Sequence, residues 1–135
     1  MKAVDSNILA RFFIDDPDDP EAARQRGPAT RVMSDPIFVP VTVLLEFEWV
    51  MRGFYLFTPV EVRRVLMALC GLSSAAVEDR NAVLHALELH SRGVDFADAL
   101  HLARSQSCEA LMTFDRDLFR RGNAKGSKLR VELVR

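Results

Sequence analysis

The sequence has 135 residues, enough for one domain with a hydrophobic core, and we expect a single domain over residues 1–135. Its composition is that of an ordinary soluble protein, with 49% hydrophobic and 27% charged residues. The formal net charge of −1 provides no overall attraction to nucleic acid or to a membrane surface. The apolar runs fall short of the roughly 18 residues that a transmembrane helix needs, so we expect no membrane association.

The start of the chain and its two cysteines indicate the compartment. The chain opens with strand-like residues and an acid rather than with a signal peptide. Cys70 and Cys108 lie in apolar helical patterns, without the CxxC spacing that is typical of a zinc site. Because two unpaired thiols suit a reducing compartment, we expect a cytoplasmic protein.

Five short apolar segments predict β-strands. They cover residues 2–4, 37–39, 75–77, 110–113 and 129–134, and the last has the loose alternation of an edge strand. Helical patterns fill the intervals between these strands, and they begin near residues 6, 20, 42, 59, 81, 95 and 115. Strands that alternate with helices predict an α/β fold of three layers, α/β/α, around a central, mostly parallel sheet of four or five short strands.

Several local signals mark the helix ends. Thr42 is expected to cap the third helix, and the segment Thr58-Pro59-Val-Glu61 has the pattern of a capping box at the start of the fourth. The pair Gly27-Pro28 is expected to interrupt the second helix or to split it in two, because proline lacks the N–H of a helical residue.

Four carboxylates occupy unusual places in this pattern. Asp5 and Asp115 directly follow predicted strands, while Glu46 and Asp98 lie in helical patterns that are otherwise apolar. Acids in such places are costly unless a cation compensates them, and a divalent metal ion compensates several acids at once. In parallel α/β sheets, ligands lie beyond the carboxyl ends of the strands. The pattern therefore predicts a metal-dependent hydrolase.

Local structural roles compete with the metal-binding interpretation for two of these acids. Asp5 also suits the cap of the first helix. Asp98 lies three residues after Asp95, and the two resemble a capping box at the start of a helix. The residues by themselves leave both interpretations open.

Neighbouring acids make the other two assignments ambiguous. Glu46 and Glu48 lie about 200° apart around their helix, so only one of them faces a given site. Asp115 and Asp117 lie at a strand end and in the first turn of the next helix, where one of them serves as a cap.

Four segments of the chain resemble the PIN-domain ribonucleases, and within them the VapC-type toxins of bacterial type II toxin–antitoxin pairs. The segments are AVDSNILARFF, VPVTVLLEFEWVMR, GVDFADALHLA and LMTFDRDLF, and the likeness covers essentially the whole chain. The D-S-N start and the FADALHLA segment are its most specific parts. The resemblance implies a PIN-like version of the α/β/α fold. It also implies an endoribonuclease that hydrolyses RNA phosphodiester bonds with Mg²⁺ or Mn²⁺.

The resemblance also implies roles for individual residues. It assigns the catalytic, metal-binding carboxylates to Asp5, Glu46, Asp98 and Asp115, and so favours Glu46 over Glu48. Ser6 matches a hydroxyl position beside the metal, and Asp117 is the alternative fourth acid.

The basic residues are concentrated in the C-terminal part of the chain, which contains Arg116, Arg120, Arg121, Lys125, Lys128, Arg130 and Arg135. This region is either a phosphate-facing edge or a solvated surface. For a ribonuclease, the candidates for contact with RNA phosphates are Arg11, Arg116, Arg120 and Arg121. Single-stranded or looped RNA is the expected substrate, because its bases are accessible.

The resemblance further implies a homodimer and a cognate antitoxin protein that blocks the site. Residues 54–57, Phe-Tyr-Leu-Phe, are expected either to form such an interface or to pack inward.

Two other functions compete with that of a ribonuclease. The first is another Mg-dependent phosphohydrolase of the haloacid dehalogenase type, in which the first strand is followed by DxD. Asp5-Ser-Asn7 lacks the second acid of that motif. The second is a catalytically degenerate PIN-like domain that binds proteins, and the presence of all four acids argues against it.

Overall fold

The computed structural model describes residues 1–123 and 129–135, so Lys125 and Lys128 of the basic region lie outside the described residues. The chain forms two compact units, an N-terminal unit of residues 1–80 and a C-terminal unit of residues 81–135. Within the described residues, no helix combines the length and the apolar character that crossing a membrane requires.

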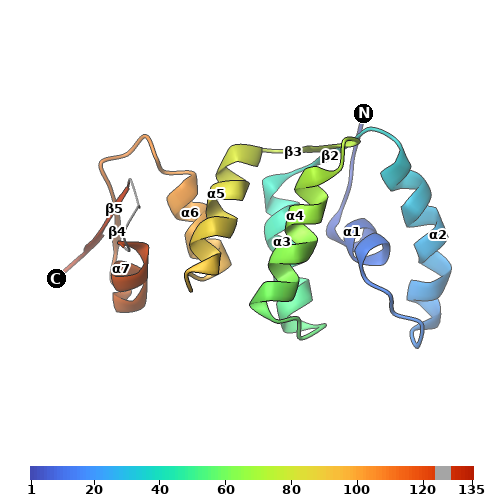
Figure 1. Cartoon of the computed structure of the whole chain (residues 1–135), viewed down its shortest axis with the longest axis horizontal. Coiled ribbons are helices and arrows are strands. Elements are labelled where there is room, and N and C mark those ends of the chain that lie inside the picture. Colours follow the sequence, from blue (N-terminus) through green and yellow to red (C-terminus); the bar gives the residue numbers. More distant parts are fainter. Residues whose placement is uncertain (124–128) are drawn as a thin grey trace. The chain divides into compact units, whose positions relative to one another are not determined.

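The N-terminal unit is built around a parallel sheet in the order β1-β2-β3 (Figure 1). Its elements are β1 (Lys2–Ala3), α1 (Ser6–Phe13), α2 (Pro20–Ser34), β2 (Ile37–Val39), α3 (Val41–Gly53), α4 (Pro59–Gly71) and β3 (Ala75–Val77). Ile37 of β2 is paired with Lys2 on one side and with Ala75 on the other. Because the strands are parallel, their carboxyl ends share one edge of the sheet.

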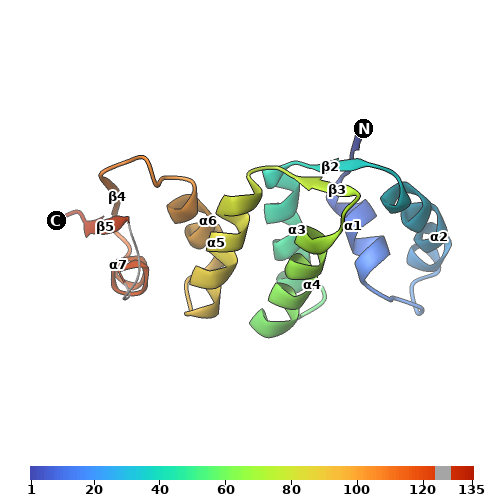
Figure 2. The ribbon, with the colours of Figure 1, turned by 45° about the horizontal axis from the view of Figure 1, so that its top comes forward.

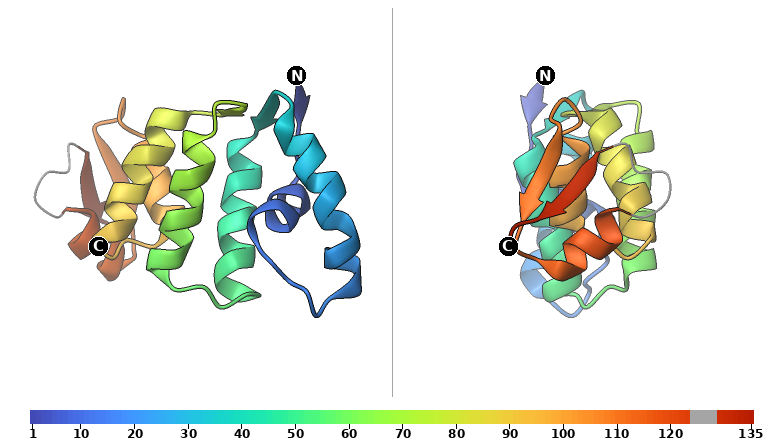
Figure 3. Two further views of the ribbon diagram at one scale, coloured as in Figure 1. Left: turned by 45° about the vertical axis from the view of Figure 1, so that its right-hand side comes forward. Right: turned by 90° about the vertical axis from the view of Figure 1, so that its left-hand side faces the viewer.

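The helices of this unit bury its core. α1 packs against α2 and α3, and α3 packs against α4, so that the four helices lie side by side with the strands near one end (Figures 2 and 3). The largest fully buried side chains of the unit include Leu9, Ile37, Phe47 and Leu66, from three helices and a strand. This packing holds α1 and α3 in fixed positions beside the sheet.

The second helix differs from the prediction, because α2 continues from Pro20 to Ser34 with Pro28 inside it. The expected break at Gly27-Pro28 is therefore wrong. Both residues are exposed, so water can satisfy the carbonyl group that loses its N–H partner at Pro28. The opposite face of α2 buries Ala22, Ala29 and Met33, and this packing on both sides of the proline holds the helix together.

The predicted cap of α3 is wrong, and the predicted capping box of α4 is confirmed. α3 begins at Val41, one residue before the expected cap Thr42, and its Val41 N–H donates a hydrogen bond to Glu78 Oε1 at 2.8 Å. This acceptor follows β3 and reaches α3 across the sheet edge. At α4, Thr58 and Glu61 form the expected capping box, with reciprocal hydrogen bonds of 2.9 and 3.2 Å.

The C-terminal unit contains a second parallel pair of strands (Figure 3, right). Its elements are α5 (Arg80–Ser91), α6 (Phe96–Ala103), β4 (Ala110–Thr113), α7 (Arg116–Gly122) and β5 (Arg130–Leu133). Thr113 of β4 pairs with Leu133 of β5, so the carboxyl ends of the two strands are adjacent. α7 packs against both strands and against α6.

The α/β class of the fold is confirmed, with parallel strands in all five predicted segments. One detail differs from the expectation of one sheet of four or five strands. Within residues 1–123 and 129–135, hydrogen bonds join the strands into two sheets, one of three strands and one of two.

Candidate active site

The carboxyl end of β1 leads directly into the first group of candidate residues. Asp5 caps α1, and its Oδ1 accepts a hydrogen bond from the Ser6 N–H at 2.7 Å. The Ser6 hydroxyl donates a hydrogen bond to Oε1 of Glu46, on α3. The packing of α1 against α3 thus brings together Asp5, Ser6 and Glu46, three of the residues that the sequence singled out.

The two glutamates of α3 have different surroundings. Glu46 is exposed at the Ser6 hydroxyl, whereas Glu48 is only 1% exposed. Glu48 accepts hydrogen bonds from Arg52 one turn later, at 3.0 Å from Nε and 3.4 Å from an Nη atom. The buried charge of Glu48 is therefore compensated within its own helix, which accounts for an acid at this position without a metal ion.

The C-terminal unit contains a second group of acids, around the start of α6. Asp95 caps this helix, and its Oδ2 lies 3.5 Å from the backbone nitrogen of Asp98. Burial raises the pKa of the Asp98 carboxyl, and the nearby charges of Asp95 and Asp115 raise it further, while His101 acts in the opposite direction. Asp98 is therefore a partly buried acid beside two other carboxylates.

Asp115 and Asp117 also differ in their contacts. Asp115 caps α7, and its Oδ1 accepts hydrogen bonds from the N–H groups of Asp117 at 2.9 Å and Leu118 at 3.1 Å. The side chain of Asp117 forms an exposed ion pair with Arg120 at 2.6 Å. Asp115 is thus the member of the pair that interacts with Asp98, and Asp117 interacts with a neighbouring arginine on its own helix.

The chemistry of both groups fits a hard divalent cation. Every candidate ligand is a carboxylate or hydroxyl oxygen, the type of donor that Mg²⁺ and Mn²⁺ prefer. Burial is the main cause of the raised pKa of Asp98, and the charges of Asp95 and Asp115 add to it, so a bound cation would relieve both the burial cost and the repulsion. Within the described part of the chain, no three His, Cys, Asp or Glu side chains form a ready-made cluster with metal-binding spacing.

The four arginines expected to contact RNA have different environments. Arg11 donates hydrogen bonds to Gln25 and Tyr55 within the N-terminal unit. Arg120 is paired with Asp117, and Arg121 donates to the Gly93 carbonyl at 3.2 Å. Arg116 instead lines a pocket at the carboxyl ends of β4 and β5.

The apolar segment 54–57 has two sides. Phe54 is 73% exposed and Leu56 is 78% exposed, whereas Tyr55 and Phe57 are partly buried. The Tyr55 hydroxyl donates a hydrogen bond to Asp16 Oδ2 at 3.3 Å, which ties this segment to the loop after α1. Tyr55 and Phe57 therefore pack inward in part, as one expectation held, while the expected interface stays a prediction for the exposed Phe54 and Leu56.

Sequence reasoning missed two residues beside the candidate acids. Asp95 was considered only as a helix cap, although its charge also acts on Asp98. Phe114 directly precedes Asp115 and is 79% exposed, which the apolar strand pattern before it did not predict.

The model of the PIN domain family matches residues 2–124, a range that contains all four candidate carboxylates. The chain belongs to the PIN domain family. PIN domains are commonly nucleases, and they typically use divalent metals. A search of curated proteins found no match.

Proposed function

We propose that this PIN domain is a metal-dependent endoribonuclease that hydrolyses RNA phosphodiester bonds. Family membership supports the nuclease class. The observation that carries the proposal is the position of Asp98, partly buried on α6 beside the carboxylates of Asp95 and Asp115. A cation bound by these carboxylates would offset this cost and would supply the chemistry that phosphodiester hydrolysis needs.

The proposed ligands of Mg²⁺ or Mn²⁺ are Asp5, Asp98 and Asp115, with Glu46 as a further ligand or as the general base. When bound, the cation would polarise a phosphoryl oxygen and make a water molecule a better nucleophile. The caps Asp5 and Asp115 both use Oδ1 for their hydrogen bonds with the described backbone, so Oδ2 of each is available to a metal ion.

Glu46 has a defined orientation for its proposed part in the reaction. The Ser6 hydroxyl donates a hydrogen bond to Oε1 and so restrains the carboxylate. Oε2 would then orient the attacking water and accept its proton, a contribution of roughly 100-fold or more to a hydrolytic rate. The attacked phosphorus carries anionic oxygens, and Arg116, which follows Asp115 in the chain, would offset their charge.

Cleavage of single-stranded RNA by the purified protein tests this proposal. We expect cleavage with Mg²⁺ or Mn²⁺, none with EDTA, and a loss of at least roughly 100-fold in Asp98→Asn. Asp117→Asn is the matched control, because it removes an acid that is paired with Arg120, and it should retain activity. Equal cleavage by wild type and Asp98→Asn would refute the mechanism. Hydrolysis of phosphomonoesters in place of RNA would support the competing phosphohydrolase.

We further propose that the chain is the toxin of a type II toxin–antitoxin pair of the VapC type. Its expression alone should then slow bacterial growth, and Asp5→Asn or Asp98→Asn should relieve the effect. The exposed side chains of Phe54 and Leu56 support a homodimer or a bound antitoxin, because large apolar residues at one surface favour protein contacts. Equal growth inhibition by the wild type and both variants would exclude toxicity through these acids.

The same exposed residues also favour a second candidate, a catalytically degenerate PIN domain that binds proteins. Titration of Mn²⁺ into wild type and Asp5→Asn separates the two functions. The nuclease requires that wild type bind the ion and that the variant lose this binding. Equal, negligible binding by both proteins would favour the binding domain.

A further inference from the structure

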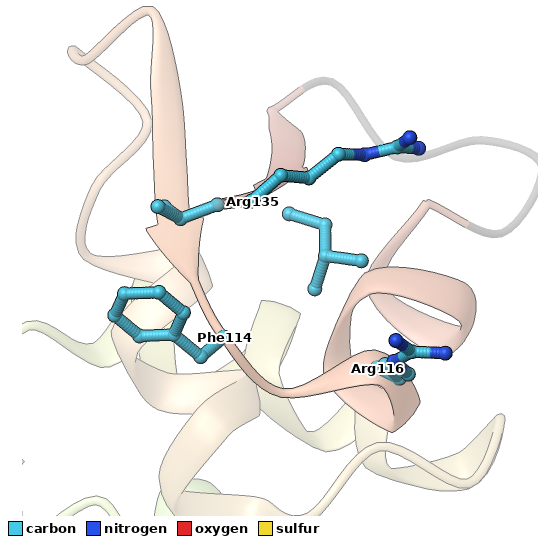
Figure 4. A pocket seen from close by; sticks show the side chains of 5 residues that line it. Phe114, Arg116 and Arg135 are labelled. Carbon is cyan, nitrogen blue, oxygen red and sulfur yellow. The ribbon is translucent and has the colours of Figure 1, made fainter.

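The pocket at the end of β4 and β5 lies within the C-terminal unit and is lined by Phe114, Arg116, Leu133, Val134 and Arg135 (Figure 4). Its volume is about 460 Å³. The register of the strands explains its construction. Thr113 is paired with Leu133, and the Val134 N–H donates to the Thr113 carbonyl at 2.8 Å. The residues that follow each strand therefore emerge next to one another.

One side of this pocket is an exposed aromatic ring. Phe114 is 79% exposed, although it directly follows a strand and precedes the cap of α7. A single exposed apolar side chain is common on protein surfaces. Here, however, the ring faces a pocket whose remaining apolar lining comes from Leu133 and Val134. A planar ligand could therefore lie against the ring with its other edges in contact with aliphatic groups.

The other side of the pocket is cationic. The side chains of Arg116 and Arg135 lie on the other side of the pocket from the Phe114 ring, with their guanidinium groups directed away from it (Figure 4). Neither forms an ion pair with another residue of the described ranges 1–123 and 129–135. In contrast, Arg130, at the amino end of β5, lies 3.7 Å from Glu132. Two guanidinium groups on one side of the pocket suit an extended ligand with more than one anionic group.

We propose that Phe114, Arg116 and Arg135 form a subsite that stacks one base of single-stranded RNA and contacts its neighbouring phosphates. The combination of an aromatic platform with arginines is typical of proteins that bind single-stranded nucleic acid. A duplex would not fit, because its bases are stacked inside the helix. Asp115, between Phe114 and Arg116 in the chain, would then lie beside the bound strand. The subsite rests on the proposed ribonuclease function and defines the form of its substrate.

A binding experiment with full-length protein tests the stacking contact. The probe is a fluorescein-labelled single-stranded RNA of about 10 nucleotides, within the usual site size, and EDTA prevents hydrolysis. Phe114→Ala should weaken binding by roughly tenfold, as expected for one stacked base, without changing the salt dependence. Phe119→Ala is the matched control, since Phe119 is also exposed on this unit but does not line the pocket. A duplex of the same sequence should bind weakly to all variants.

Substitution of the arginines should, in contrast, change the salt dependence of RNA binding. Arg116→Gln and Arg135→Gln should each weaken binding and reduce the slope of log affinity against log salt concentration by about 0.7 per phosphate contact. Arg130→Gln, at the opposite end of β5, should leave the slope unchanged. Phe114→Trp in a Trp49→Phe background should retain binding, and RNA should quench its fluorescence. This variant keeps the test decisive if Phe114→Ala folds poorly.

Several results would overturn the subsite. The first is that Phe114→Ala binds RNA as wild type does and that RNA does not quench the fluorescence of Phe114→Trp. The second is that Phe114→Ala loses affinity equally for duplex and for single-stranded RNA. The third is that Phe114→Ala loses self-association and keeps its affinity for RNA. The last would assign Phe114 to a protein contact. The ribonuclease proposal would fail in a different way. In that case RNA would bind through Phe114, but wild type would not cleave it with Mg²⁺ or Mn²⁺.

Discussion

Asp5 and Asp115 are helix caps that use one carboxylate oxygen, which leaves the other oxygen for the proposed metal ion. The sequence presented these roles as alternatives for Asp5, because a helix cap explains an acid after a strand without any metal. In the structure each residue is indeed a cap, and each uses Oδ1 for this purpose. The second oxygen is the one that the proposed chemistry needs. Capping would then hold the carboxylate in the orientation that coordination of a metal ion requires.

Two substitutions at Asp5 separate these roles. Asp5→Asn retains an amide oxygen that caps a helix as well as aspartate does, so the free energy of unfolding in EDTA should stay within about 0.5 kcal/mol of wild type. Asp5→Ala should lose about 1 kcal/mol through the missing cap. Both should lose Mn²⁺ binding. Urea unfolding and calorimetric titration measure these quantities. Retention of full Mn²⁺ affinity by Asp5→Asn would leave Asp5 a cap alone.

The capping box of α4 predicts how stability depends on acid pH. Hydrogen bonds from Thr58 lower the pKa of Glu61 below its usual 4.5 in the folded protein. The unfolded chain therefore binds a proton at Glu61 more readily, and the stabilisation is fully present above the unfolded pKa and lost as pH falls through the folded pKa. Glu61→Gln should flatten this part of the pH profile of unfolding. A profile identical to that of wild type would contradict the prediction.

At the scale of the elements, the sequence predicted every strand but not every helix boundary. The strands are short apolar runs between helices, a local signal that survives in the fold. The start of α3 depends on Glu78, which lies 37 residues from Val41 in the chain, so no local pattern contains it. Similarly, α2 continues through Pro28 because tertiary packing of Ala22, Ala29 and Met33 outweighs a local propensity.

Two helical glycines should respond in opposite directions to the same substitution. An added methyl group at Gly27 would meet only the Arg31 guanidinium, at 3.7 Å. Gly27→Ala should therefore raise the free energy of unfolding by roughly 0.5–1 kcal/mol, because glycine loses more backbone entropy on folding. At Gly122, the methyl group would lie 2.7 Å from Val131 Cγ2 and 3.2 Å from Leu102 Cδ1.

Gly122→Ala should accordingly lower the free energy of unfolding by roughly 1–3 kcal/mol, as overpacking does. Chemical denaturation of both variants under the same conditions measures the contrast. Stabilisation by Gly122→Ala would mean that α6, α7 and β5 do not approach as closely as the contacts around Gly122 indicate.

At the scale of the whole molecule, residue types and their order predicted the fold class, and the roles of the four candidate acids stay a prediction. The sequence could not show which side chains those acids contact. Ser6 and Glu46 are 40 residues apart, and their hydrogen bond exists because α1 packs on α3. The choice between Glu46 and Glu48 illustrates the limit. A helical wheel separates the two side chains, yet only the packing of α3 determines which of them is buried with Arg52.

Metal binding by these acids should stabilise the entire protein. The carboxylates of Asp95, Asp98 and Asp115 repel one another in the folded state, and a bound cation would remove this cost only in that state. A ligand at 100 times its dissociation constant adds about 2.7 kcal/mol to the free energy of unfolding, so Mg²⁺ or Mn²⁺ should raise the melting temperature of wild type. The shift should be abolished in Asp98→Asn and retained in Asp117→Asn, whose side chain is paired with Arg120. Thermal unfolding at constant ionic strength, with Na⁺ replacing the divalent ion in the reference, measures it. Equal shifts in wild type and Asp98→Asn would mean that the ion acts through general screening of charge and not through these acids.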